Sequence, residues 1–100
     1  MAFKIPERIR VGGITYTIEY SDKLIRESRV GEIDYHDAVT RICKSTAPDV
    51  QAWTFWHEIV HAMLMTLGYH PGDEAELDER FVDSFASVVG CVFEELLGKS

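Results

Sequence analysis

One short stretch of the chain has residue types and spacing that suit metal chemistry. It reads His57-Glu58-Ile59-Val60-His61, the pattern H-E-x-x-H. Residues four apart on an α-helix share one face, so His57 and His61 can direct two imidazoles at one cation. Glu58 is rotated by about 100° from His57 and can reach a water on that cation instead. The stretch therefore predicts two zinc ligands and a general base on one helix.

A catalytic zinc needs a third protein ligand, and the acidic residues further along the chain are the candidates. Glu79 and Asp83 share a stripe at helical spacing with Ala86 and Gly90, which are small enough to let two helices approach closely. Carboxylates in such a stripe favour a buried role over a solvated one. We therefore predict that Glu79 is the third ligand. Asp83 would accept a hydrogen bond from the non-ligating ring nitrogen of His57.

Two alternatives stay open at this point. Glu76, Asp78 or Asp83 could replace Glu79 as the third ligand, although Glu74, Glu76 and Asp78 also suit the positively polarised start of a helix. A helical hairpin that binds no metal is the weakest interpretation. It predicts that chelators leave folding and function unchanged.

Length and composition restrict the class of protein. One hundred residues, 46% of them hydrophobic, suffice for one domain (1–100) with one packed core. The sequence has no apolar run long enough to cross a membrane, and its first residues lack the apolar stretch of a secretory signal. We therefore expect a cytoplasmic protein without a membrane partner. Cys43 and Cys91 are then expected to be reduced and buried.

The net charge of −7 is concentrated in the second part of the chain. After residue 44 there are only two cationic residues, Arg80 and Lys99, against ten of the seventeen carboxylates. Phosphate binding needs Lys and Arg, so this balance argues against nucleic acid as a direct partner. It favours a divalent cation and a neutral or basic partner.

The first part of the chain is predicted to form strands. Apolar and polar residues alternate on both sides of Gly12-Gly13, which indicates a hairpin. A second hairpin is predicted over residues 31–43, with a turn near His36 and Asp37. Residues 22–29 are polar and are predicted to form a turn or one helical turn.

The second part is predicted to form two helices. Thr46-Ala47-Pro48-Asp49 resembles a capping box, and the helix after it runs to about Leu67, where Gly68 ends it. The next helix runs from about Glu74 to Leu97, after a cap at Asp73. The expected apolar faces are Trp53, Trp56, Val60, Met63, Leu64 and Leu67 on the first helix, and Leu77, Phe81, Phe85, Val88, Val89, Val92 and Leu96 on the second.

The elements together predict an α+β fold: a small antiparallel sheet of three or four strands packed with two main helices. Trp53 and Trp56 are expected to belong to the core, although Trp53 shares the His57 face and could line the cleft. His36 is expected to be structural.

Two segments resemble a known group of metallopeptidases. His57-Glu58-x-x-His61 followed by Glu79-x-x-x-Asp83 is similar to the gluzincin pattern. Residues 79–86 resemble the E-x-x-A-N-x-F-A segment of the ImmA/IrrE family (the domain of unknown function 955 group), in its small phage and prophage members. The resemblance covers roughly residues 30–97. Asp83 stands where many members have Asn, and the helix-turn-helix segment of many relatives has no counterpart here.

The resemblance implies a minimal zincin-like core that acts as a zinc-dependent metallopeptidase. Bound Zn²⁺ acidifies a water, Glu58 takes its proton, and the hydroxide attacks a peptide carbonyl. The expected partner is a protein or peptide substrate, such as a regulatory protein, which would pair with an edge strand at Val39–Cys43. Tyr69, His70 and Tyr35 are the candidates for stabilising the oxyanion of the transition state.

A second function remains possible from the sequence. A non-catalytic zinc-binding module with the same fold would bind a protein partner, such as a repressor, without hydrolysis. Glu58 favours the peptidase, because a purely structural zinc site needs no base. The small size favours the module, since 100 residues leave little chain for a deep substrate cleft.

Overall fold

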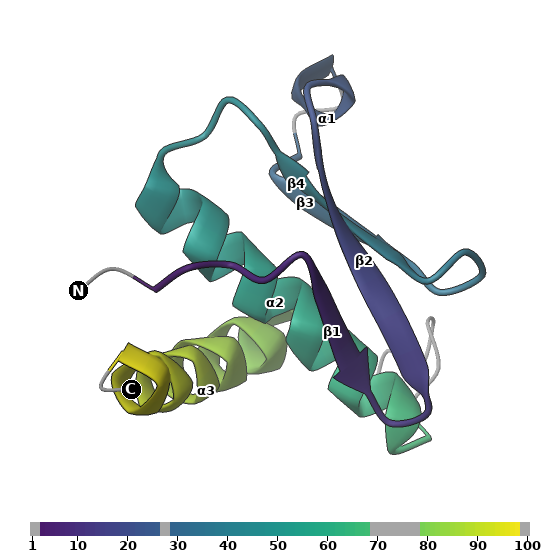
Figure 1. Cartoon of the computed structure of the whole chain (residues 1–100), viewed down its shortest axis with the longest axis vertical. Coiled ribbons are helices and arrows are strands. Elements are labelled where there is room, and N and C mark those ends of the chain that lie inside the picture. Colours follow the sequence, from purple (N-terminus) through teal and green to yellow (C-terminus); the bar gives the residue numbers. More distant parts are fainter. Residues whose placement is uncertain (1–2, 27–28, 69–78, 99–100) are drawn as a thin grey trace.

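The computed structural model describes residues 3–26, 29–68 and 79–98. Its strands are β1 (Arg8–Val11), β2 (Ile14–Ser21), β3 (Gly31–Asp34) and β4 (Val39–Cys43). Its helices are α1 (Lys23–Arg26), α2 (Pro48–Thr66) and α3 (Glu79–Gly98). Figure 1 shows one small sheet beside the two long helices, so the predicted α+β class is confirmed.

The sheet has the order β1-β2-β4-β3. Gly12-Gly13 closes the first hairpin, and Gly12 has the positive φ of 64° that this turn requires. β3 and β4 form the second hairpin, but β4 lies beside β2 and runs parallel to it. The sheet is therefore mixed, not wholly antiparallel as expected. The chain after β2 passes through α1 to the outer strand β3 before it returns as β4.

This strand order corrects the expected position of the edge. β4 is flanked on both sides, and its Thr40 and Ile42 side chains are completely buried. Among the described residues, the two edges of the sheet are β1 and β3. The expectation that residues 39–43 offer an edge to a substrate is therefore wrong, because β4 lies between β2 and β3.

Helix α2 begins and ends near the predicted residues, but its start is built differently. Pro48 is its first residue, while Ala47 at the N-cap makes no side-chain cap hydrogen bond. The Thr46 hydroxyl donates instead to the Cys43 carbonyl at 2.9 Å. The predicted capping box is therefore wrong, because the end of β4 engages the hydroxyl that would have capped the helix. At the other end Gly68 adopts a φ of 100°, as expected for a helix stop.

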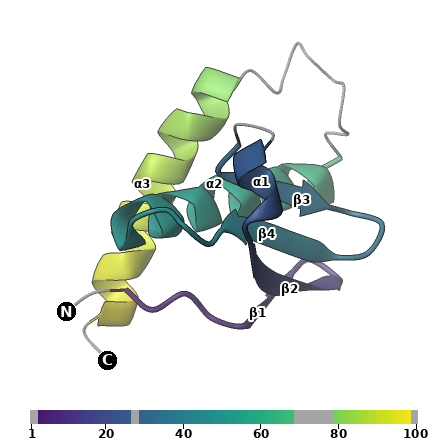
Figure 2. The same cartoon turned by 90° about the horizontal axis from the view of Figure 1, so that it is seen from above.

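Helix α2 lies between the sheet and α3, as both Figure 1 and Figure 2 show. Phe55 and Ile59 are completely buried in the core with Tyr16 and Ile42 of the sheet. The predicted apolar face is partly correct. Its buried members are Trp56, Val60 and Leu64, Met63 is partly buried, and Trp53 and Leu67 are exposed.

Helix α3 packs on α2 through its small residues. Val82 and Ala86 are buried, and a Cβ added to Gly90 would lie 2.8 Å from Cδ1 of Trp56. Close helix–helix approach through the Ala86–Gly90 stripe is therefore confirmed. Of the apolar face predicted for this helix, Val89 is partly buried against the core. The other described members are exposed: Phe81, Phe85, Val88, Val92 and Leu96. Periodicity identified an apolar face, but the small residues decide which face meets α2. Asp73, Leu77 and residues 74–78 lie outside the described residues.

The two cysteines differ in their exposure to solvent. Neither cysteine forms a disulfide, and Cys43 is buried as predicted, whereas Cys91 is exposed. Cys91 lines an open groove between α2 and α3 and is exposed there, so its predicted burial is wrong. Among the described residues, no helix has the length and apolarity needed to span a membrane.

Candidate metal centre

Helix α2 places both motif histidines on one face, one turn apart. The rings of His57 and His61 have centroids 5.0 Å apart. Their side chains are 12% and 18% exposed, so each ring has most of its surface covered while an edge stays accessible. The α-helical period alone produces this pairing.

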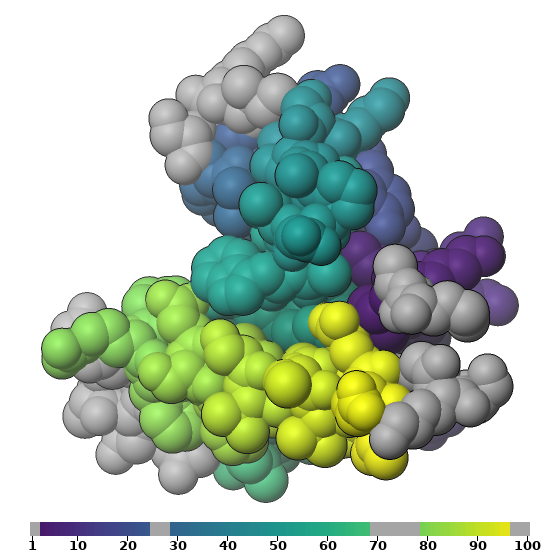
Figure 3. Space-filling model, turned by 90° about the vertical axis from the view of Figure 1, so that its left-hand side faces the viewer, coloured from purple at the N-terminus to yellow at the C-terminus, as the bar shows by residue number. Residues whose placement is uncertain are grey.

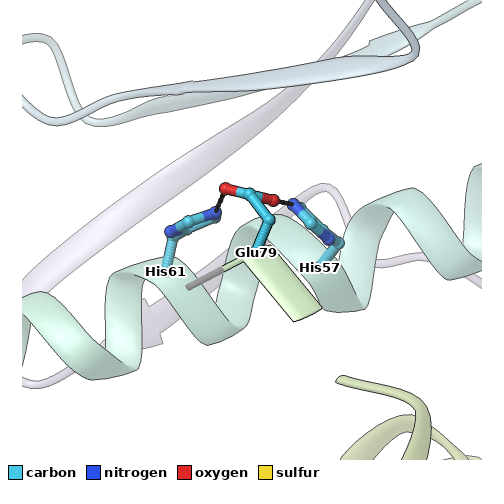
Figure 4. Close-up of side chains that lie close together, drawn as sticks. All are labelled: His57, His61 and Glu79. Atoms are coloured by element: carbon cyan, nitrogen blue, oxygen red, sulfur yellow. Dashed lines mark ion pairs between the residues drawn. The ribbon is translucent and has the colours of Figure 1, made fainter. Parts of the chain in front are cut away.

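Helix α3 adds the third group. Glu79 Oε2 lies 3.1 Å from Nε2 of His57, and its Oε1 lies 3.4 Å from Nε2 of His61. Figure 4 shows the carboxylate between the two imidazoles. The ligand atoms all lie within 4.8 Å of one another, so His57, His61 and Glu79 could hold a metal ion. The Glu79 side chain is 66% exposed, which leaves one side of this group open to solvent.

Asp83 lies against the far nitrogen of His57. Its Oδ1 is 2.8 Å from Nδ1 of His57, and both atoms are buried. The contact is short enough for an ion pair, but its angles depart from those of a well-formed hydrogen bond, and neither atom bonds elsewhere among the described residues. A proton on Nδ1 facing Asp83 leaves the Nε2 lone pair facing Glu79. This is the tautomer that a metal-ligating histidine needs, so the donor set fits a metal ion.

Glu58 is buried beside the histidines, with 7% of its surface exposed. Its pKa is raised to about 8, mainly by burial and secondly by the negative charge of Glu79. A cation nearby would oppose this shift, because it favours the ionised form of a neighbouring carboxylate. Burial also lowers the pKa of His61, which favours the neutral imidazole that a metal requires.

Strand β3 passes close to α2 at this point. A Cβ on Gly31 would overlap Cγ2 of Thr54 and would lie 3.2 Å from Oε2 of Glu58. Only a glycine lets the strand approach the helix this closely. The role of Gly31 was not predicted from the sequence. The one signal for it was the presence of a glycine at the start of a predicted strand.

Two aromatic side chains border the centre. The ring centroids of Trp53 and His57 lie 5.2 Å apart, and Trp53 is 41% exposed, so Trp53 lies beside the centre and not in the core as expected. Trp53 also lines a groove of about 340 Å³ between α2 and α3, together with Trp56, Ser87 and Glu94. Tyr35 follows β3, and burial, followed by the charge of Glu58, raises its pKa to about 12. Its phenol therefore keeps its proton across the physiological range.

The remaining predicted residues fall into two groups. His36 is exposed in a turn, with Nδ1 2.9 Å from Oδ1 of Asp37. It takes no part in the centre, as expected. Tyr69 and His70, like the alternative ligands Glu74, Glu76 and Asp78, lie outside the described residues.

No family model, no curated protein and no solved structure matches this chain.

Proposed function

We propose that this protein is a zinc-dependent metallopeptidase of the ImmA/IrrE-like, gluzincin type. The observation that carries the proposal is the convergence of His57, His61 and Glu79 within 4.8 Å, with the buried carboxyl of Glu58 on the same helical turn. Two imidazoles and one carboxylate are a ligand set that suits zinc and leaves one position for water.

Each residue has a separate task in this proposal. When bound, the zinc ion supplies a water acidic enough to lose its proton near neutral pH. Glu58 accepts that proton and later delivers it to the leaving amine. Asp83 keeps the His57 ring in one tautomer and one orientation.

The substrate is proposed to be an extended stretch of protein, bound along β3. This strand is an edge of the sheet, and it passes beside Glu58 at Gly31. An edge strand offers backbone donors and acceptors with which an extended peptide can pair. Tyr35 lies just after the same strand, and its protonated phenol is the candidate among the described residues for stabilising the oxyanion.

The non-catalytic module is the second candidate, and one observation is compatible with it. The apolar side chains exposed along α3 are typical of a protein-binding surface. This observation does not separate the two functions, because an enzyme can also carry such a surface. Glu58 separates them, since only hydrolysis requires a base.

The test begins with elemental mass spectrometry of the purified protein. We expect about one zinc per chain, lost in Glu79→Ala and kept in Glu95→Ala, a control on the same helix. If the parent protein contains no metal after zinc is supplied, the proposal is wrong.

Hydrolysis is tested next with unstructured protein substrates and the zinc-loaded chain. Glu58→Gln should keep the zinc and lower turnover by about 10²–10⁴-fold. Zinc binding without any hydrolysis by the parent protein would favour the non-catalytic module. Equal turnover in the parent and in Glu58→Gln would exclude Glu58 as the base.

A further inference from the structure

Helix α3 carries a second apolar surface that the core does not use. Five side chains at i, i+4, i+7, i+11 and i+15 form it, and we call it the outer stripe: Phe81, Phe85, Val88, Val92 and Leu96. They are 43–63% exposed. Figure 3 shows α3 as a continuous ridge on the surface, in front of α2. The stripe lies on a different face from the residues that pack on α2.

The side chains of the outer stripe are contiguous, as in a protein interface, and are not isolated apolar residues. The rings of Phe81 and Phe85 stack with centroids 5.7 Å apart. Exposed apolar side chains scattered singly are common, whereas a contiguous stripe over four turns is typical of a helix that packs on a partner.

We propose that the outer stripe binds a second copy of this chain, as an antiparallel pair of α3 helices. The stripe reads almost the same in both directions about a point between Val88 and Val89. An antiparallel pair centred there places Phe81 opposite Leu96 of the second copy, and Phe85 opposite Val92. Each large ring then faces a smaller side chain, which is the self-complementary arrangement that a two-fold interface requires.

The charges along the helix favour the antiparallel direction. Ser84, Ser87 and Cys91 each precede a residue of the stripe in the sequence, and none of them is an acidic or basic residue, so the middle of the stripe has no charged neighbour on that side of the sequence. Arg80 is near one end of the stripe and Glu95 is near the other. Antiparallel pairing brings these opposite charges together, whereas parallel pairing would bring like charges together.

The area of the stripe is close to what a specific dimer needs. A fully exposed aromatic side chain has about 150–250 Å² of surface, and the observed exposure leaves the stripe with on the order of 400 Å² per copy. Two stripes, with the polar side chains that flank them, would bury about 1,000 Å². This total is at the threshold of about 1,000 Å² for a biological interface and is typical of a weak, reversible dimer. Glu79 and Asp83 lie on another face of α3, so the pair would leave the metal centre open.

The oligomeric state tests the proposal directly. Sedimentation equilibrium should show a mass that rises with concentration from 11.4 kDa towards twice that value. Val88→Glu, at a position already 63% exposed, should raise the dimer dissociation constant by about tenfold or more while the circular dichroism spectrum is retained. Tyr20→Glu is the matched control, because Tyr20 is 46% exposed on the sheet, and it should leave the dimer intact.

Cross-linking tests the direction of the pair. In a Cys91→Ser background, Val88→Cys should form a disulfide-linked dimer on mild oxidation, because position 88 lies near the two-fold axis. Phe81→Cys should not, since antiparallel pairing separates the two copies of residue 81 along the helix by roughly 20 Å. Cross-linking at position 81 and not at 88 would refute the antiparallel pair. A monomer at every concentration, or a dimer unaffected by Val88→Glu, would refute the interface. Zinc content and turnover are measured separately, so either proposal can fail alone.

Discussion

Nδ1 of His57, on α2, lies 2.8 Å from Oδ1 of Asp83, on α3. Asp83 therefore contacts the ring nitrogen of His57 that faces away from Glu79. The other ring nitrogen of His57 faces Glu79, also from α3. One imidazole therefore contacts two carboxylates that are one helical turn apart. The two helices have to keep their relative position for both contacts to persist.

The role of Asp83 can be measured by metal titration. Asp83→Ala should weaken zinc affinity by about 10–100-fold, because His57 loses the group that fixes its tautomer. Asp83→Asn should retain more of the affinity, since the amide oxygen can still accept from Nδ1. Ser84→Ala is the control on the next residue. If Asp83→Ala binds zinc as the parent protein does, Asp83 is only a surface carboxylate.

The choice of third ligand is tested by comparing two carboxylates. Glu79→Ala should weaken zinc affinity far more than Glu76→Ala, because Glu79 approaches both imidazoles to within 3.4 Å. Competition with a chromophoric chelator gives both affinities on one scale. Equal losses in the two variants would contradict the assignment of Glu79.

In the metal-free protein, the contribution of Glu58 to stability should fall as the pH rises. The pKa of Glu58 is raised from 4.5 to about 8 in the folded chain, first by burial and then by Glu79. Between these two values the folded chain keeps a proton that the unfolded chain has released. Unfolding then releases a proton, so the free energy of unfolding falls with pH, by on the order of a few kcal/mol in total.

Denaturant titrations of the metal-free protein between pH 5 and pH 8 measure this slope. Glu58→Gln has no group to ionise at this position and should reduce the slope. If the parent protein and the variant show the same dependence on pH, the buried carboxyl is not its source.

Gly31 should be intolerant of a side chain. A Cβ at this position meets Cγ2 of Thr54, so Gly31→Ala should lower the free energy of unfolding by about 1–3 kcal/mol. Gly13→Ala, in the turn between β1 and β2, is the control, because a Cβ there meets nothing within 4 Å. Chemical denaturation compares the two. An unchanged stability in Gly31→Ala would mean that β3 can move away from α2 without loss.

The local parts of this molecule could be predicted from the sequence. The helical period places His57 and His61 together, and the small residues Ala86 and Gly90 indicate which face of α3 meets α2. That packing brings Glu79 to the histidines. Hairpin signals and the Gly68 helix stop are equally local, because each depends on a few neighbouring residues. The catalytic and ligand roles of these residues stay predictions.

The parts that depend on distant contacts could not be predicted in the same way. Nothing within β4 shows that β2 will lie on one side of it and β3 on the other, since the order depends on the path through α1. The hydroxyl of Thr46 had two possible acceptors, and the end of β4 decides between them. The apolar period of α3 likewise shows which residues share a face, but it does not show whether the rest of the chain covers that face.

The position of α3 has a consequence for how the chain holds together. This helix packs mainly on α2, and not on the sheet. An ion shared by His57, His61 and Glu79 would join the two helices in the folded chain. Because unfolding separates these three ligands, the bound ion would stabilise the folded state by mass action, by about 2.7 kcal/mol when the free ion is at a hundred times its dissociation constant. The concentration of free metal would then determine how stably α3 packs on α2. Amide exchange in α3 would report it first.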